Sequence, residues 1–420
     1  MNTALAARLD IYFESRLVGF IYDTAPLSFE YAPGWVASQA FQIANIALQP
    51  GRNAEPSVST FFENLLPEGE LRDYLFSAKQ ASTLFGLLRA VAGDTAGGFV
   101  LLQSGRTLPT QSYRATSWAA LAEELQSKAA SAITLKSRGR RISLAGAQEK
   151  LSLTLFADGI PRLGLGVSPS THLLKPDIQR FDGVWASAVN ETLIMQAASG
   201  CGLQAARVFF EPTTRACVVQ RFDRYTHTPG TIGRILQYDL CQLSSLPSGK
   251  KYEAEGGPSL YDCAALVRKY STVPATDLRR LLAWVFFNLF TGNNDSHAKN
   301  LSIYSPPGGG VRLTPFYDLM CTRLYPGLGQ NFAFNIGGTT RPGEVERQHI
   351  VALAQALNMR PAFVLRMGHE LAQQLPGVLR QCAQSLQPLL KPAEAVLTQR
   401  LVNYVNKTTR QAAKRMQLGS

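Results

Sequence analysis

The sequence predicts an α+β protein with two lobes, an additional α/β subdomain at its N-terminus and a mostly helical C-terminal lobe. Up to about residue 225, short alternating apolar segments typical of strands are interspersed with a few helical patterns. Beyond that point helical periodicity dominates. The expected parts are residues 1–105, 115–225 and 226–420, which suits a 420-residue chain of two or three domains.

The composition is that of a globular protein with a basic surface. Hydrophobic residues make up 45% of the chain, and the formal net charge is +12. That charge suits an acidic partner such as a nucleotide, a nucleic acid or an acidic protein, although a solvated basic surface explains it equally well.

The cysteines and the apolar stretches indicate the cellular compartment in which the protein is expected. Six scattered cysteines without a C-x-x-C pair indicate a reducing compartment and exclude the spacing of a zinc finger. The N-terminus lacks the apolar run of a signal peptide. The strongest apolar stretch, 281–290, is shorter than the roughly 20 residues that span a bilayer. We therefore expect a cytoplasmic protein without a membrane partner.

The first part, 1–105, begins with "LDIYFESRLVGFIYD", which alternates as two strands. Residues 57–76 indicate a helix interrupted at Pro67, and a glycine-rich turn over 93–98 separates a second helix from a strand. Gly97 and Gly98 could belong to a phosphate loop, but a plain turn is the better interpretation. Residues 104–114 are expected to be a linker.

The second part contains the features that matter for chemistry. A basic, small-residue stretch (136–150) precedes a strand at 151–156 and a hairpin turn at Asp158-Gly159. A short strand within 170–178 carries Lys175, and a helix over 185–202 carries Glu191. Further strands lead through 215–225 into a connector. In the third part, helices are expected at 238–245, 260–270, 276–292 and beyond 345.

Side chains suited to phosphoryl transfer follow one another in a fixed order along the chain. Such a site needs a lysine on the phosphates, a carboxylate that orients the attacking hydroxyl, and hard oxygen ligands for Mg²⁺. Lys175 and Glu191 come first, Asp295 and Asn300 have the D-x-x-x-x-N spacing of a kinase catalytic loop, and Asp318 follows. This order predicts a protein-kinase-like fold with an ATP site.

Each residue taken alone also has an ordinary interpretation. Lys175 could be a strand-end lysine and Glu191 a solvated helix residue. Asp295 and Asn300 could cap a helix. His297 could be a structural residue or a phosphate contact, and the two remain open.

Several segments together resemble the HipA family of serine/threonine kinase toxins. They are "SLAGAQEKLSL" (143–153), "THLLKP" (171–176), "NETLIMQAASGCGL" (190–203), "QRFDR" (220–224), "LQYDLCQL" (236–243), "NDSHAKNLS" (294–302) and "LTPFYDL" (313–319). "FFENLLPEG" (61–69) and "GDTAGGFVLL" (93–102) resemble the N-terminal subdomain of that family. The resemblance covers most of the chain.

The resemblance implies a role for each matching residue. Lys175 would bind ATP, Gln220 and Phe222 would meet adenine through the backbone, and Asp223 would contact the ribose. Gln220 stands where members of the family often have Glu. The loop Ala145, Gly146, Ala147, Gln148 and Glu149 would bind phosphate, and Ser143 would be autophosphorylated. Asp295 would be the catalytic base, and Asn300 and Asp318 would bind Mg²⁺. Apart from the resemblance, His297 and Lys299 on the same loop are further catalytic candidates.

The implied activity is phosphorylation of a serine on an aminoacyl-tRNA synthetase, which halts translation. The implied partner is a small helix-turn-helix antitoxin that binds operator DNA. Arg138, Arg140 and Arg141 could capture a phosphate on Ser143 and draw the loop away from the nucleotide, so autophosphorylation is expected to inactivate the kinase. A small-molecule kinase and a DNA-bound co-repressor with a vestigial site are the alternatives.

Overall fold

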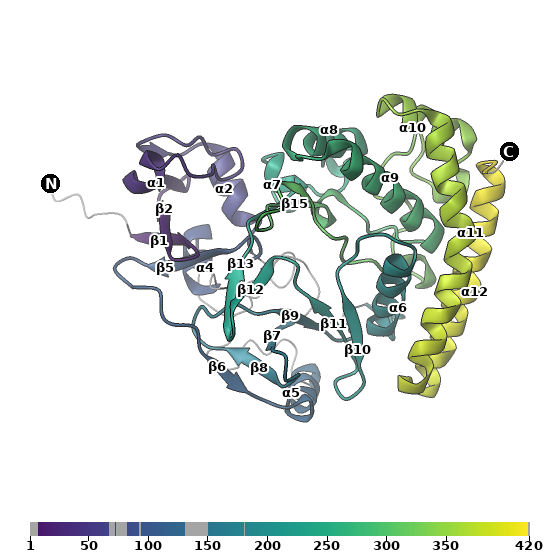
Figure 1. The fold of residues 1–420 in the computed structure, drawn as a ribbon, viewed down its shortest axis with the longest axis horizontal. Helices are drawn as coiled ribbons and strands as arrows, with labels where there is room; N and C mark the ends of the chain where they lie inside the picture. The colour runs from purple at the N-terminus through teal and green to yellow at the C-terminus, as the bar shows by residue number, and fades with distance from the viewer. Residues whose placement is uncertain are drawn as a thin grey trace.

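The protein is described from a computed structural model, which covers residues 7–66, 72, 82–91, 94–130, 150–179 and 181–418. Figure 1 shows an N-terminal sheet, a second sheet and a helical lobe, with the long helices α11 and α12 at the outer edge. The expected two-lobed, protein-kinase-like α+β fold with an additional N-terminal subdomain is confirmed.

The N-terminal part is built on a five-stranded antiparallel sheet of order β4-β3-β2-β1-β5. Its strands are β1 (Arg8–Phe13), β2 (Arg16–Tyr22), β3 (Ser28–Tyr31), β4 (Arg52–Asn53) and β5 (Phe99–Gln103), and its helices are α1 (Pro33–Ala37), α2 (Pro56–Glu63) and α4 (Leu84–Val91). The two strands predicted at the start, and the helix and strand on either side of the glycine-rich turn, are confirmed. Pro67, where the helix was expected to break, lies outside the described residues.

Burial explains why this sheet forms. Leu9 and Ile11 on β1 are buried, as is their neighbour Ile21 on β2. Phe61 and Phe62 of α2 pack into the same core, with Phe62 5.8 Å from the ring of Phe29. Full burial of each such side chain stabilises the fold by about 1.5–3 kcal/mol. These residues belong to the same buried cluster as the core of the helical lobe, so the sheet packs onto the rest of the protein.

The second sheet has six strands in the order β10-β11-β9-β7-β8-β6. They are β6 (Tyr113–Ala115), β7 (Leu151–Leu155), β8 (Pro161–Gly164), β9 (His172–Lys175), β10 (Val208–Glu211) and β11 (Ala216–Gln220). Helices α5 (Trp118–Ala130) and α6 (Ser187–Gly200) belong to this part. The expected linker 104–114 is wrong at its end, because Tyr113 and Arg114 pair with β8 as an edge strand.

The connector leads from the second sheet into the helical lobe. It is followed by a hairpin of β12 (Arg224–Thr228) and β13 (Thr231–Arg234), and by a small sheet of β14 (Gln237–Asp239), β15 (Ser302–Tyr304) and β16 (Arg312–Leu313). The small sheet pairs residues 237–239, which follow the hairpin, with residues 302–304, and these in turn with residues 312–313. It therefore brings the chain after the hairpin next to the segments that follow residue 300.

The helical lobe is centred on α9 (Pro274–Thr291), most of which is buried. The other helices are α7 (Leu240–Leu243), α8 (Leu260–Tyr270), α10 (Arg347–Ala356), α11 (Pro361–Leu386) and α12 (Pro392–Arg415), so the expected helices are confirmed with α7 shorter than predicted. Pro274 occupies the first turn of α9, where a missing N–H costs nothing. Gly292, at φ +71°, ends the helix and turns the chain into the loop at 293–300.

Within the described parts of the chain, none of the helices combines the length and the apolar character needed to cross a bilayer.

Candidate active site

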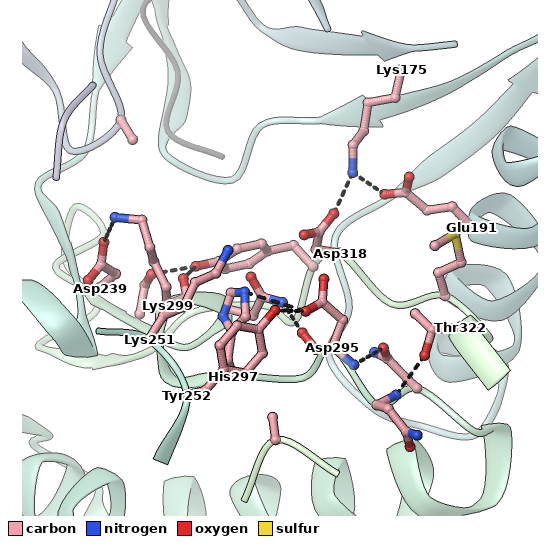
Figure 2. Close-up of a pocket in the computed structure, with 18 of the residues that line it drawn as sticks. Lys175, Glu191, Asp239, Lys251, Tyr252, Asp295, His297, Lys299, Asp318 and Thr322 are labelled. Carbon is pink, nitrogen blue, oxygen red and sulfur yellow. Dashed lines mark hydrogen bonds and ion pairs between the residues drawn. The ribbon is translucent and has the colours of Figure 1, made fainter. Parts of the chain in front are cut away.

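A cavity of about 630 Å³ lies where the two lobes and the N-terminal part meet. Figure 2 shows the polar side chains that enter it. The lining includes residues of the second sheet, α6 and the connector, of the segments 237–255 and 293–300, of the segment around Asp318 and of 328–333. The N-terminal part adds Asn64, Leu65 and Ala96. Polar groups from distant segments thus converge on one hollow, as in most active sites.

Lys175 places its ammonium group in this cavity between two carboxylates. It ends β9, and the next residue, Pro176, prevents the strand from continuing. Its Nζ lies 2.5 Å from Oε1 of Glu191 on α6 and 2.6 Å from Oδ1 of Asp318 (Figure 2). Burial alone would lower the pKa of Lys175, but the two carboxylates outweigh burial and raise it, so the ammonium stays charged.

Asp318 reaches Lys175 from the helical lobe in a strained backbone conformation. Its φ of +60° is left-handed, which costs a non-glycine residue about 1–3 kcal/mol. The segment before it is anchored by the bridge between Phe316 and Ala205 and by the Tyr317 hydroxyl, which donates to the Lys299 carbonyl at 2.9 Å. Burial raises the pKa of Asp318, but the charge of Lys175 more than reverses this and brings the pKa to about 2.

The loop at 293–300 presents Asp295 to the cavity. The Asn293 side chain donates to Asn288 Oδ1 at 2.8 Å, and its own Oδ1 accepts from the Asp295 N–H at 3.2 Å. The Asn300 amide donates to the Asp295 carbonyl at 3.0 Å. These bonds fix the backbone, while the Asp295 side chain is 53% exposed and accepts a hydrogen bond from the Tyr252 hydroxyl (Figure 2).

Asn300 and Asp318 carry the oxygen atoms that suit a magnesium ion. The Asn300 Nδ2 is bonded to the Asp295 carbonyl, so its Oδ1 is the atom able to bind a cation. The Asp318 carboxylate is ionised and 44% exposed within the cavity. Mg²⁺ is commonly held by one or two such oxygens together with the phosphates of a nucleotide, so this pair fits the ion.

His297 and Lys299 stand on the same loop with different surroundings. His297 is buried, with Nε2 4.0 Å from Asp295 Oδ1 and its ring edge-on to Tyr252 at 5.1 Å. The Lys299 ammonium donates to Asn64 Oδ1 at 2.5 Å and to Asp239 Oδ2 at 3.2 Å. Both residues line the cavity, and these contacts give each of them a part in holding the loop.

The connector lines the cavity with Gln220, Phe222 and Asp223. Gln220 is exposed, and the half-buried Phe222 lies 5.4 Å from the ring of Tyr317. The carboxylate of Asp223 accepts from Arg221 at 2.7 Å and from Arg224 at 2.8 Å. Asp223 therefore reaches the cavity wall with its side chain bound by two arginines, and any contact with a ribose would compete with these ion pairs.

The predicted autophosphorylation site and phosphate loop lie outside the described residues. The positions concerned are Ser143, the loop Ala145, Gly146, Ala147, Gln148 and Glu149, and the arginines Arg138, Arg140 and Arg141.

The structure adds residues that sequence reasoning missed. Tyr252 and Asn64 contact the loop at 293–300 from far along the chain. Tyr252 stands in no recognisable motif, and Asn64 lies within the family-like segment 61–69, which by itself indicates no role for this side chain. Asp239 did have a signal, because with Gln242 it forms the capping box that begins α7. Asp94, which pairs with Arg221 and Arg224 of the connector region, lies in the glycine-rich segment for which a plain turn is the sequence interpretation.

The comparisons with known proteins agree with this arrangement. Residues 142–379 match the family model of the HipA-like C-terminal domain, and residues 9–102 match that of the HipA N-terminal domain. The Y4mE protein of Sinorhizobium fredii is 35% identical over 80% of this chain and 83% of its own. The serine/threonine-protein kinase toxin HipA of Shewanella oneidensis is 28% identical over 93% of this chain and 92% of its own.

A solved structure extends the likeness to the fold. HipA of Shewanella oneidensis MR-1, in a complex with HipB and its operator DNA, superposes with a TM-score of 0.83 at 25% identity, covering 98% of this chain and 100% of that one.

Proposed function

The chain belongs to the HipA family of serine/threonine kinase toxins, and from this premise we propose that its cavity binds Mg·ATP and transfers the γ-phosphate to a serine of another protein. One observation carries the proposal: the Lys175 ammonium bridges Glu191 and Asp318 within the cavity that also contains Asp295. Phosphoryl transfer depends mainly on positioning and charge neutralisation, and these residues supply both.

The proposed roles follow from the geometry. Lys175, kept charged by its two carboxylates, would neutralise a phosphate oxygen. Asp295, whose backbone is fixed while its carboxylate faces the cavity, would orient the acceptor hydroxyl and take up its proton. Asn300 and Asp318 would hold Mg²⁺, which supplies charge neutralisation between the phosphates when bound. The backbone of Gln220 and Phe222 would meet the adenine.

The finer roles of the flanking groups are proposals as well. The loop at 145–149 would cover the phosphates, and Asp223 would contact the ribose. Phosphate transfer to Ser143 would inactivate the kinase, because a phosphoserine adds about −1.5 to −2 charge beside three arginines. The parts 1–105, 115–225 and 226–420 would correspond to the N-terminal subdomain, the ATP-binding part and the catalytic lobe.

The proposed biological role is that of the toxin in a toxin–antitoxin pair. Its substrate would be an aminoacyl-tRNA synthetase, and its partner a small helix-turn-helix antitoxin bound to operator DNA, all in the cytoplasm. The HipA of Shewanella oneidensis in complex with HipB and operator DNA supports the partner, and the net charge of +12 suits a complex containing DNA.

The test is to incubate the purified, dephosphorylated protein with Mg·ATP and a panel of aminoacyl-tRNA synthetases, followed by intact mass and peptide mapping. The proposal predicts one phosphate on a serine of one synthetase and one on Ser143, both absent with Asp295→Ala. Phosphate transfer to a small molecule alone would favour a metabolite kinase. ATP binding without any transfer would favour the co-repressor role.

A further inference from the structure

Asn64 reaches from the end of α2 into the catalytic cavity and binds the loop that carries Asp295. Its side chain is almost fully buried, and its Oδ1 accepts from Lys299 Nζ at 2.5 Å. Its Nδ2 donates to the carbonyls of Thr60 at 2.8 Å and Leu246 at 2.9 Å. Both ends of the amide are therefore engaged, and its orientation is fixed.

This contact continues to the candidate catalytic residues. Lys299 immediately precedes Asn300, whose amide donates to the Asp295 carbonyl at 3.0 Å. The Lys299 carbonyl also accepts from the Tyr317 hydroxyl, one residue before Asp318. A displacement of Lys299 would thus move the loop that carries Asp295 and Asn300, and would disturb the Tyr317 contact next to Asp318.

Asp94 makes a second contact, with the connector. Its Oδ2 accepts from the Ser170 hydroxyl at 2.5 Å and from Arg221 at 3.2 Å, and its Oδ1 accepts from Arg224 at 2.8 Å. The carbonyl of the next residue, Thr95, accepts from both arginines at 3.0 Å. Arg221 lies between Gln220 and Phe222, so the carboxylate holds the segment proposed to meet the adenine.

The backbone around these residues lies close against the kinase part of the molecule. A Cβ on Gly97 would lie 2.7 Å from the Gln237 carbonyl, and one on Gly98 would lie 3.2 Å from Arg234 Cβ. Asn64, Leu65 and Ala96 themselves line the cavity. The part of the chain before residue 104, which we call the N-terminal unit, therefore forms one wall of the site.

We propose that the N-terminal unit is a positioning component of the kinase site, in which Asn64 sets the catalytic loop through Lys299 and Asp94 sets the nucleotide connector through Arg221 and Arg224. The inference rests on the proposed function, because it assigns these two residues to separate steps of that reaction. Asn64 acts on phosphoryl transfer, and Asp94 acts on nucleotide affinity.

The test separates kcat from nucleotide affinity in matched variants. Asn64→Leu removes the shorter of the two side-chain hydrogen bonds of Lys299 and leaves the one to Asp239 Oδ2 at 3.2 Å. It is expected to lower kcat about 10- to 100-fold, as misplaced catalytic groups typically do, with the Kd for Mg·ATP within about threefold. Asn64→Asp keeps an acceptor for Lys299 but loses the donors to Thr60 and Leu246, so it should retain most of the kcat that the leucine variant loses.

Asp94→Asn keeps the shape of the side chain and removes its charge. It is expected to raise the Kd for Mg·ATP about tenfold, the scale of a lost charge-assisted hydrogen bond, with kcat within about threefold. Ser170→Ala is the milder variant, should Asp94→Asn fail to fold. Asp23→Asn, an exposed carboxylate of the same unit, serves as control and should change neither quantity.

Hydrogen exchange gives a readout that does not depend on activity. Amides of 293–302 should exchange faster in Asn64→Leu, and those of 216–225 in Asp94→Asn or Ser170→Ala. If the wild type transfers no phosphate, the proposed function fails. The hydrogen-exchange rates of the variants then test by themselves whether Asn64 and Asp94 position the two segments. The inference is overturned if the folded variants match the wild type in exchange, or if Asn64→Leu and Asn64→Asp lose kcat equally.

Discussion

The ion pair between Lys175 and Glu191 allows a specific prediction about activity, because one substitution weakens the pair without changing the shape of the site. Glu191→Gln replaces one carboxylate oxygen by an amide, and the Lys175 ammonium then keeps one charged partner, Asp318, at 2.6 Å. Both partners of the original pair are buried, and their Nζ and Oε1 atoms lie 2.5 Å apart.

The size of the effect follows from that geometry. A hydrogen bond to a charged group contributes about 1.5–3 kcal/mol, and each 1.36 kcal/mol of transition-state stabilisation is about tenfold in rate. If the pair positions Lys175 on the phosphates, Glu191→Gln should lower kcat/KM about 10- to 150-fold. Binding of Mg·ATP should weaken less, because Lys175 remains charged and in place beside Asp318.

The assay is phosphate transfer measured under initial-rate conditions, together with chemical unfolding of both proteins. Glu394→Gln is the matched control, since Glu394 is also a buried glutamate paired with an arginine, Arg215, but it lies on α12. The control should lose stability and keep its activity. Equal activity of Glu191→Gln and the wild type, or an equal loss of activity in the control, would show that the pair does not position Lys175 for transfer.

Three further predictions concern the metal, pH and packing. Asp318→Asn should raise the Mg²⁺ concentration needed for half-maximal activity about tenfold or more, in an activity titration with Mg²⁺, since it removes the carboxylate of the proposed pair. Burial lowers the pKa of His172 from its ordinary 6.5 to about 4, so the unfolded chain binds the proton first and stability should fall as pH drops from 6.5 to 4. Urea midpoints of His172→Gln should lack that slope. Gly97→Ala and Gly51→Ala both place alanine at a left-handed φ, but only at Gly97 does the Cβ meet a carbonyl, that of Gln237 at 2.7 Å, while Gly51 faces open space. Gly97→Ala should therefore unfold at lower denaturant, with about 1–3 kcal/mol of additional destabilisation from that close approach.

The sequence predicts those features of the site that depend on residues close together along the chain. The spacing of Asp295 and Asn300, the strand that ends at Lys175 and Pro176, and the helix that carries Glu191 each depend on neighbouring residues. Their order along the chain was enough to predict a kinase-like fold, and the structure brings Lys175, Glu191, Asp295, Asn300 and Asp318 to one cavity.

The remaining features depend on contacts between distant parts of the chain. Asn64 and Lys299 are 235 positions apart, and an asparagine after a short helix looks the same whether or not it binds a catalytic loop. Tyr252 lies 43 residues before Asp295 in a segment without a periodic pattern. The ion pairs of Asp223 with Arg221 and Arg224 show a similar limit, because sequence gives a residue its place but not the direction of its side chain.

The most direct test of the account compares Mg·ATP binding with single-turnover phosphate transfer in the wild type and in Asp295→Asn. Calorimetry measures the first quantity and rapid quenching the second. If Asp295 is the base, the two proteins should have similar Kd values for Mg·ATP, and the variant should transfer phosphate about 10²- to 10⁴-fold more slowly, the usual cost of losing a positioned base. A wild type that binds no Mg·ATP, or a variant that transfers phosphate at the wild-type rate, would contradict the proposed mechanism.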